Sequence, residues 1–245
     1  MNIFTQAGRY FALLMRVFSK PERYSLYTRQ TFNEIDKLGV KSVGIVVIIS
    51  IFMGGITTLQ VAYNMSNPLL PVYLIGLGNR DTLILEFSST IMALIMAGKI
   101  GSNITSEIGS MKVTEQIDSL EIMGVNSASY LILPKIIAVV AIFPLLYILS
   151  VFFGLIGGMI VGPAVNAVSV TDYLNGIQHL FNPYYVTFSL IKCVVFGFLI
   201  ASIAAFFGYN VEGGAFDVGA ASTRAVVNTN ILILVWDLIL TQLLL

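Results

Sequence analysis

Long apolar runs, separated by short polar segments, dominate the pattern of this chain. Ser42–Asn79 contains no charged residue over about 38 positions, and Ile136–Thr171 is a second uncharged run. A helix of about 20 apolar residues crosses a hydrocarbon core of about 30 Å. The pattern therefore predicts an all-α integral membrane protein. We expect about five transmembrane helices, at residues 42–63, 82–104, 135–161, 185–209 and 226–245.

The first uncharged run is too long for one crossing, because a helix rises about 1.5 Å per residue. Residues that interrupt helices lie within it: Asn64, Asn67, Pro68 and Pro71. We therefore expect the first span to end near residue 63, followed by an outer loop that can dip back into the bilayer. In the third span Pro144 predicts a kink. Three glycines there allow close helix contact: Gly154, Gly157 and Gly158.

Residues 1–20 form a separate amphipathic pattern. At about 100° per residue, aromatic and aliphatic side chains share one face, whereas Arg9 and Arg16 lie on the opposite face. This arrangement is typical of a helix that lies in the membrane interface, and we expect Pro21 to end it. The alternative, a helix packed on a soluble domain, needs such a domain, and none is visible. The segment lacks the continuous apolar core of a signal peptide, so we expect targeting through the spans themselves.

Composition supports a membrane protein. Hydrophobic residues make up 57% of the 245 positions and charged residues 11%, with a mean hydropathy of +0.88. Soluble domains carry about a quarter charged residues, and 13 basic residues balance 13 acidic ones here. Disordered chains, nucleic-acid-binding proteins and cytosolic enzymes are therefore poor interpretations. Because Cys193 and His179 are single and no G-x-x-x-x-G-K-[ST] loop is present, we expect no catalytic residue, metal or cofactor in this chain.

The distribution of lysine and arginine predicts the orientation. Seven of these residues lie within positions 1–41, whereas the loop after the first span holds only Arg80 and the loop at 162–184 holds none. Basic residues accumulate on the cytoplasmic side of membrane proteins. We therefore expect a cytoplasmic N-terminus and an outer C-terminus.

A polar segment between the second and third predicted spans is partly amphipathic. A helix that begins at about Val113 places Val113, Ile117, Leu120 and Gly124 on one narrow face, and Gly124 can end it. A different face carries the acidic residues Glu115, Asp118 and Glu121. Such a helix either covers the inner end of the bundle or inserts into a cleft of a soluble partner and carries force into the membrane. The periodicity leaves both interpretations open.

Sequence blocks along the chain resemble the signature of the MlaE/YrbE permeases, the membrane subunits of ABC transporters that work with MCE-domain proteins. The most specific block is E-Q-x-x-x-L-x-x-M-G at Glu115–Gly124. The others are Ala97–Ser102, Glu107–Met111, Tyr130–Lys135, Leu190–Phe196, Gly213–Ala215, Thr223–Val227 and Asp237–Thr241. The resemblance covers nearly the whole chain. It implies a single permease domain over residues 1–245, with an interfacial and cytoplasmic N-terminal segment at 1–34.

The resemblance also implies roles and partners. A coupling helix at about 112–124 would dock on a cytoplasmic ABC ATPase, which would bind the ATP and Mg²⁺. The matching residues are Glu115, Gln116, Leu120, Met123 and Gly124. A second copy of the chain, an MCE-domain lipid-binding protein outside and a phospholipid substrate complete the implied system, in the bacterial cytoplasmic (inner) membrane. Lys99 stands where the family usually has arginine, and Ser89 follows Glu86 where it often has proline.

Four ionisable residues lie within or at the ends of predicted spans: Glu86, Lys99, Lys192 and Asp237. Each costs about 2.5–3.5 kcal/mol at a helix centre on insertion scales, so such groups tend to face the bundle interior, to pair and to mark functional sites. Glu86 and Lys99 can also extend toward the two interfaces. Lys192 is the best candidate to meet an anionic head group or a buried carboxylate. Mutual neutralisation and a direct part in transport both remain open.

Two other functions are compatible with the same spans. An ion-coupled secondary transporter would work without an ATPase and would depend on Glu86 or Asp237, although no inverted repeat is visible. A passive membrane scaffold for an MCE-domain protein would assemble regardless of substitution at Glu115 or Leu120. Nucleic acid is not an expected partner.

Overall fold

The computed structural model describes residues 3–19, 24–65 and 70–245. Within these ranges the regular secondary structure is helical, and five helices are long and apolar enough to cross a membrane. They are Tyr27–Asn64, Leu74–Val113, Ser127–Ala164, Pro183–Tyr209 and Ala215–Leu244. The prediction of an all-α membrane protein with about five spans is confirmed. Pro21, Asn67 and Pro68, which we expect to interrupt helices, lie outside the described residues.

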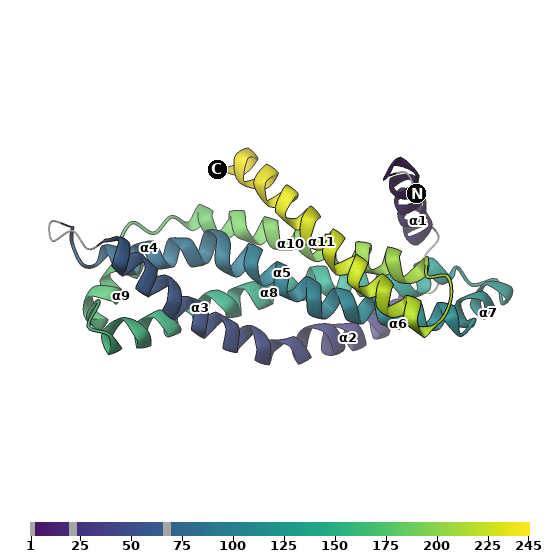
Figure 1. Ribbon diagram of the computed structural model, residues 1–245, viewed down its shortest axis with the longest axis horizontal. Coiled ribbons are helices and arrows are strands. Elements are labelled where there is room, and N and C mark those ends of the chain that lie inside the picture. Colours follow the sequence, from purple (N-terminus) through teal and green to yellow (C-terminus); the bar gives the residue numbers. More distant parts are fainter. Residues whose placement is uncertain (1–2, 20–23, 66–69) are drawn as a thin grey trace.

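The elements form one elongated bundle. In chain order they begin with α1 (Ile3–Phe18), α2 (Tyr24–Glu34), η1 (Ile35–Gly39), η2 (Val40–Ser42), α3 (Val43–Asn64), α4 (Leu74–Thr82), η3 (Leu83–Ile91), α5 (Met92–Met96), η4 (Ala97–Gly101) and α6 (Ser102–Val113). The others are α7 (Gln116–Ile122), α8 (Ser127–Ala164), α9 (Val170–Gln178), α10 (Pro183–Tyr209) and α11 (Ala215–Leu244). Figure 1 shows α7 at one end of the bundle and α4 and α9 at the other.

The long helices extend beyond the predicted spans, mostly at the α7 end. The 38 residues of α8 correspond to about 57 Å, against a hydrocarbon core of about 30 Å. Hydropathy reports only the part of a helix that lies in lipid, so its polar continuation is not visible in the apolar pattern. For the same reason, the apolar pattern did not show that α2 continues into the first long helix. The residues of α2 were expected to belong to the N-terminal segment. The helix α8 continues through Pro144, and the kink there stays a prediction.

The second long helix contains two π-helical segments. These are η3, nine residues long, and η4, five residues long; they carry Glu86 and Lys99. A π-helical segment inserts extra residues into a helical turn and occurs frequently at functional sites. Because α4 leads directly into η3, the outer residues extend this helix, and the expected re-entrant loop is wrong for residues 74–82. The backbone of Gly76 in α4 lies against that of Tyr173 in α9, a contact that hydropathy does not encode.

The helices α3 and α8 cross at glycines. A Cβ atom on Gly54 would overlap the carbonyl group of Gly154, and one on Gly157 would overlap the carbonyl group of Ile51. Small residues let helix backbones approach closely in membranes, where van der Waals packing drives association. The expected close contact at Gly154 and Gly157 is confirmed, and Gly158 is equally confined.

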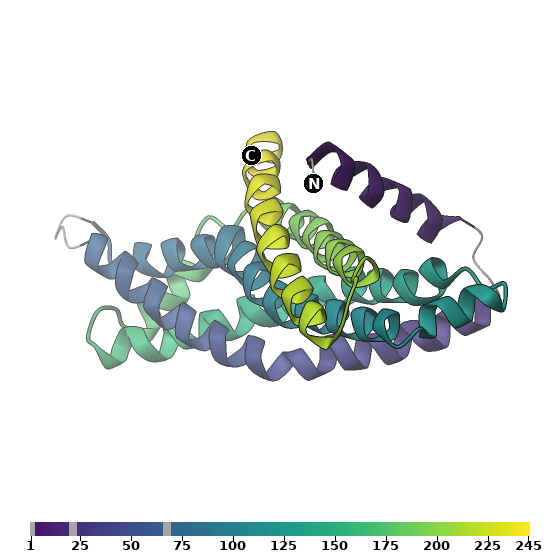
Figure 2. The same cartoon turned by 45° about the vertical axis from the view of Figure 1, so that its right-hand side comes forward.

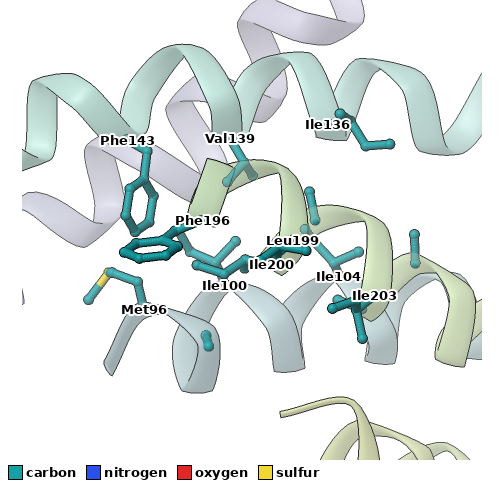
Figure 3. Close-up of a cluster of buried hydrophobic side chains, with 14 of the residues drawn as sticks. Met96, Ile100, Ile104, Ile136, Val139, Phe143, Phe196, Leu199, Ile200 and Ile203 are labelled. Carbon is teal, nitrogen blue, oxygen red and sulfur yellow. The ribbon is translucent and has the colours of Figure 1, made fainter. Parts of the chain in front are cut away.

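A buried apolar cluster fixes α10 between the second and third long helices (Figure 3). Met96, Ile100 and Ile104 project from one side, and Phe143 approaches Phe196 of α10 from the other. All five side chains are essentially inaccessible. Interiors of this density resist displacement of single elements. The α10 side chains that precede this cluster are therefore held in a defined position.

The helix α1 lies crosswise to the long helices at the α7 end (Figures 1 and 2). Leu13 and Val17 are buried against the bundle, and the Tyr10 hydroxyl lies 2.8 Å from Ser202 Oγ. Phe11 and Met15 face outward and are 62% and 69% exposed. The position of α1 in the membrane interface stays a prediction. The packing of Tyr10 on α10 was not predicted. The apolar face of an amphipathic helix can contact either lipid or protein, and the sequence pattern does not distinguish the two.

Candidate functional site

Three of the four predicted intramembrane charges meet at one point in the bundle. Glu86 comes from η3, Lys192 from α10 and Asp237 from α11. The Lys192 Nζ atom lies 2.5 Å from Asp237 Oδ1, and 3.2 and 3.3 Å from the two carboxylate oxygens of Glu86. Of the two predicted partners of Lys192, an anionic head group or a buried carboxylate, the structure places carboxylates beside it, and both are partly exposed. We call these three residues the charged cluster.

Further polar groups complete the surroundings of the charged cluster. The Thr90 hydroxyl lies 2.8 Å from Asp237 Oδ1 and 3.2 Å from Glu86 Oε2. Lys192 Nζ also approaches the ring of Phe188, with 4.9 Å to its centroid. A buried charge is tolerated when it is paired and hydrogen-bonded. The arrangement therefore accounts for an ammonium group that is fully buried between two acidic side chains.

The π-helical segment η3 contributes backbone carbonyl groups to the same region. Ser189 Oγ donates to Ile84 O at 2.7 Å, and Lys192 Nζ donates to Leu85 O at 3.2 Å. Irregular helical backbone inside a membrane is stable only where protein groups satisfy its hydrogen bonds. The polar residues of α10 thus stabilise the segment that presents Glu86. This contact could not be predicted from the sequence, because no motif marks a π-helical stretch.

The charged cluster opens to one side. The side chain of Lys192 is 0% exposed and that of Asp237 is 17% exposed, whereas that of Glu86 is 43% exposed. A separate small cavity of about 20 Å³ lies between α3 and η3–α5, and its wall includes Phe87 and Ser88 but not Glu86. The buried Ser88 Oγ has no hydrogen-bond partner within the described part of the chain. A polar group that approaches the exposed side of the charged cluster would reach Glu86 first.

Lys99 does not join the charged cluster. Its Nζ atom donates to the backbone oxygen of Lys41 at 2.6 Å, and this group is exposed. It therefore lies toward the α7 end, in the manner expected of a lysine that extends to the interface. The same expectation is wrong for Glu86, because η3 turns its carboxylate toward α10.

The coupling segment differs from its predicted form at its start. Val113 is the last residue of α6, and a turn with Glu115 in the left-handed region (φ 60°) separates it from α7. The expected helix beginning at Val113 is therefore wrong, and Val113 does not share the α7 face. Lys112 Nζ and Asp118 Oδ1, 2.6 Å apart, bridge the turn. A local ion pair and a positive φ at one residue are not visible in helical periodicity.

Several contacts fasten α7 to the long helices. Glu121 Oε1 lies 2.6 Å from Arg16 Nη2 of α1, and it accepts hydrogen bonds from Ser127 Oγ at 2.8 Å and Tyr209 OH at 2.9 Å. The side chain of Ile117 is buried beneath α7. One short helix thus contacts α1, α8 and α10.

Two large apolar side chains are exposed at the C-terminal end of α7. Ile122 is 87% exposed and Met123 is 69% exposed. Glu115, Gln116 and Gly124 are also exposed, whereas Leu120 is half-buried. Ile122 was missed in the sequence, because it occupies an unspecified position of the E-Q-x-x-x-L-x-x-M-G block that singled out Met123. Exposed apolar side chains at a tip surrounded by polar residues mark interaction surfaces.

At the opposite end of the bundle, Arg80 is a further residue whose position the sequence did not predict. It is 2% exposed, and its Nη1 atom donates to the carbonyl oxygens of Ile177 at 2.7 Å and His179 at 2.8 Å. Its other partner is Asp81, with 2.8 Å between Nη2 and Oδ1. The residue counted above as a loop charge therefore joins α4 to the end of α9. Within the described ranges, no group of three histidine, cysteine or acidic side chains could hold a metal ion.

Comparison with known proteins identifies the family. Residues 31–243 match the family described as Permease MlaE. A probable ABC transporter permease protein of Synechocystis is 32% identical over 238 residues, covering 95% of this chain and 88% of the relative. The intermembrane phospholipid transport system permease protein MlaE of Haemophilus influenzae is 32% identical over 249 residues, covering 98% and 92%. Protein TRIGALACTOSYLDIACYLGLYCEROL 1 of Arabidopsis thaliana is 28% identical, covering 89% and 62%. The resemblance drawn from the sequence blocks is confirmed, and the chain belongs to the MlaE permease family.

Proposed function

We propose that this chain is the permease subunit of an ABC transporter that moves phospholipids or similar lipids between membranes, driven by a separate ATPase. Membership of the MlaE family and the printed function of the Haemophilus relative support the substrate class. The observation that carries the proposal is the exposed apolar pair Ile122 and Met123 on a short helix that is fastened to three other helices. This chain performs no bond chemistry.

The segment from Lys112 to Gly124 transmits movement from the ATPase to the spans. Ile122 and Met123 insert into a cleft of the ATPase, and Glu115 and Gln116 border this contact. Coupling requires that the ATPase contacts α7 differently in its nucleotide states, since a ligand shifts an equilibrium only through differential affinity. Glu121 then carries the displacement to α1, α8 and α10.

The charged cluster lies on the lipid path. Glu86 is its exposed member, with 43% of its side chain accessible. A phospholipid on this path therefore presents its head group to the carboxylate of Glu86, whereas Lys192 lies behind it and is fully buried. Intramembrane ionisable residues commonly mark such substrate pathways.

Assembly involves a second copy of the chain and an MCE-domain protein on the outer side. The helix α11 supports this proposal, because only 17% of its most apolar window is buried within one chain. The excess of basic residues before the first span supports a cytoplasmic position for the N-terminus and α7. The protein then resides in the bacterial inner membrane.

Copurification of ATPase activity tests the proposal. The tagged chain is purified from its native membranes, and bound ATPase activity is measured for wild type, Ile122→Glu and Glu115→Lys. Phe32→Glu is the matched control, because Phe32 is also an exposed apolar residue, 72% accessible, outside α7. We expect Ile122→Glu to lower bound activity at least tenfold, Glu115→Lys to lower it less, and the control to retain it.

The alternatives give different results. Lipid transfer that persists without any ATPase and depends on Glu86 would identify an ion-coupled transporter. Normal assembly and ATPase activity in both α7 variants would identify a passive scaffold.

A further inference from the structure

A cavity of about 340 Å³ lies at the α7 end of the molecule, between α1 and the turn that joins α10 to α11. Figure 2 shows α1 and α11 on either side of α10. The α1 wall is formed by Gln6 and Arg9, and the α11 wall by Asp217, Ala220, Ala221 and Arg224. Phe206, Phe207 and Asn210 of α10, with Val211 and Glu212 of the turn, complete the lining.

Two arginines converge on this cavity without acidic partners. Arg9 and Arg224 are exposed, and neither forms an ion pair with any residue in the ranges that the structure describes. Of the two acidic residues in the lining, Asp217 is engaged, because its Oδ2 accepts from the backbone N–H of Gly214 at 2.9 Å. The cavity therefore contains two guanidinium groups and two carboxylates, and of the two carboxylates that of Glu212 has no hydrogen bond within the described residues.

The position of the cavity corresponds to the membrane surface. It lies where α10 ends at Tyr209 and α11 begins at Ala215. Large apolar side chains project outward nearby: Phe11 is 62% exposed and Phe216 is 89% exposed. Aromatic residues beside arginine at the ends of spans are typical of the interface, where lipid head groups lie. The charged cluster is elsewhere, because Lys192 precedes Asn210 by 18 positions, about 27 Å along a helix.

We propose that this cavity binds the head group of a phospholipid from the leaflet on the α1 side, with its phosphate between Arg9 and Arg224 and its amino group at Glu212. Guanidinium groups bind phosphate oxygens through paired hydrogen bonds. The carboxylate of Glu212 attracts an ammonium group and repels a second anion. The site thus selects phosphatidylethanolamine over phosphatidylglycerol and fastens α1 to α11. This inference requires only that the chain spans a membrane, and it does not depend on the ATPase or on transport.

Photocrosslinking of a lipid to the full-length chain tests the site. The protein is placed in nanodiscs of phosphatidylethanolamine and phosphatidylglycerol, with a photoreactive phosphatidylethanolamine whose diazirine lies close to the glycerol. Crosslinked peptides are identified by mass spectrometry, and the experiment is repeated with photoreactive phosphatidylglycerol. Wild type is compared with Arg9→Ala/Arg224→Ala and with Arg29→Ala/Lys41→Ala, which removes two exposed basic side chains outside the cavity.

We expect crosslinks to phosphatidylethanolamine on peptides that contain residues 206–224. The Arg9→Ala/Arg224→Ala variant should lower their yield about tenfold, because each basic residue at a lipid surface contributes to head-group binding. The charge-matched control should leave the yield unchanged. Glu212→Gln should bring the two lipids to equal yield, and Ala221→Trp, which fills the cavity, should lower the yield without changing charge.

Equal yields in Arg9→Ala/Arg224→Ala and in the charge-matched control would overturn the proposal. Equal crosslinking of both lipids to wild type would also overturn the assignment of Glu212. Transport measurements take no part in this experiment, so its failure leaves the permease proposal unaffected.

Discussion

The ammonium group of Lys192 lies 2.5 Å from Asp237 Oδ1, although the two residues belong to different long helices, α10 and α11. Glu86 of η3 lies on the other side of the same ammonium group. The cluster thus joins the second, fourth and fifth long helices at one point. Any rearrangement of these helices must break or exchange one of its contacts.

Removal of the central cation should destabilise the protein. Lys192→Met leaves two acidic side chains close together without their common partner, and breaking a buried pair from one side costs about 3–5 kcal/mol. We expect membrane insertion to proceed, a lower temperature of unfolding in detergent, and impaired lipid transfer in reconstituted vesicles. The neutral triple variant Glu86→Gln/Lys192→Met/Asp237→Asn should regain much of the stability. If the triple variant also regains lipid transfer, the charged cluster is structural only.

The contact between α3 and α8 at Gly54 should not tolerate a side chain at this position. Gly54→Ala forces a Cβ atom against the Gly154 carbonyl group, and overpacking of this kind costs about 1–3 kcal/mol. Gly44→Ala is the matched control on the same helix, because the space beside Gly44 is open and alanine favours a helix over glycine by about 1 kcal/mol. Thermal unfolding in detergent should separate the two variants. Equal unfolding temperatures would contradict the observed crossing.

Arg80 should hold the end of α9 in place. Lysine at this position retains the charge but lacks the planar fork that serves Ile177, His179 and Asp81 together. Hydrogen bonds to charged groups contribute about 1.5–3 kcal/mol each, so Arg80→Lys should lower hydrogen-exchange protection at residues 175–182 about tenfold or more. Arg29→Lys is the control, since Arg29 is exposed. Unchanged protection in Arg80→Lys would show that α9 is held by its other contacts.

Glu121 should make the attachment of α7 depend on pH. The hydroxyl of Ser127, with additional contributions from Tyr209 and Arg16, lowers the pKa of Glu121 from its ordinary value of 4.5. A carboxylate whose pKa is lower in the folded state contributes stability above the unfolded value, and this contribution disappears as the pH falls through the folded value. The unfolding temperature of wild type should therefore exceed that of Glu121→Gln at pH 7. The difference should shrink progressively below about pH 4.5, and a constant difference would exclude this role.

The spans and the amphipathic helix at the N-terminus could be predicted from the sequence because both depend on side-chain hydropathy along a single helix. The runs around Ser42–Asn79 and Ile136–Thr171 indicate helices in lipid wherever the rest of the chain lies. The Glu115–Gly124 block identified the family for a similar reason, since its pattern is local. The predicted ends of the helices were less accurate where a helix continues beyond the hydrocarbon core. Its backbone hydrogen bonds continue there through residues that are not apolar.

Only the tertiary structure decided which polar groups meet. Lys192 and Asp237 are brought together by the packing of α10 and α11, and η3 turns Glu86 toward them while Lys99 remains apart. Neither the exposure of Ile122 nor the burial of Arg80 follows from local periodicity. Contacts between distant segments depend on the rotation and depth of each helix, and helix packing fixes both after every helix has formed.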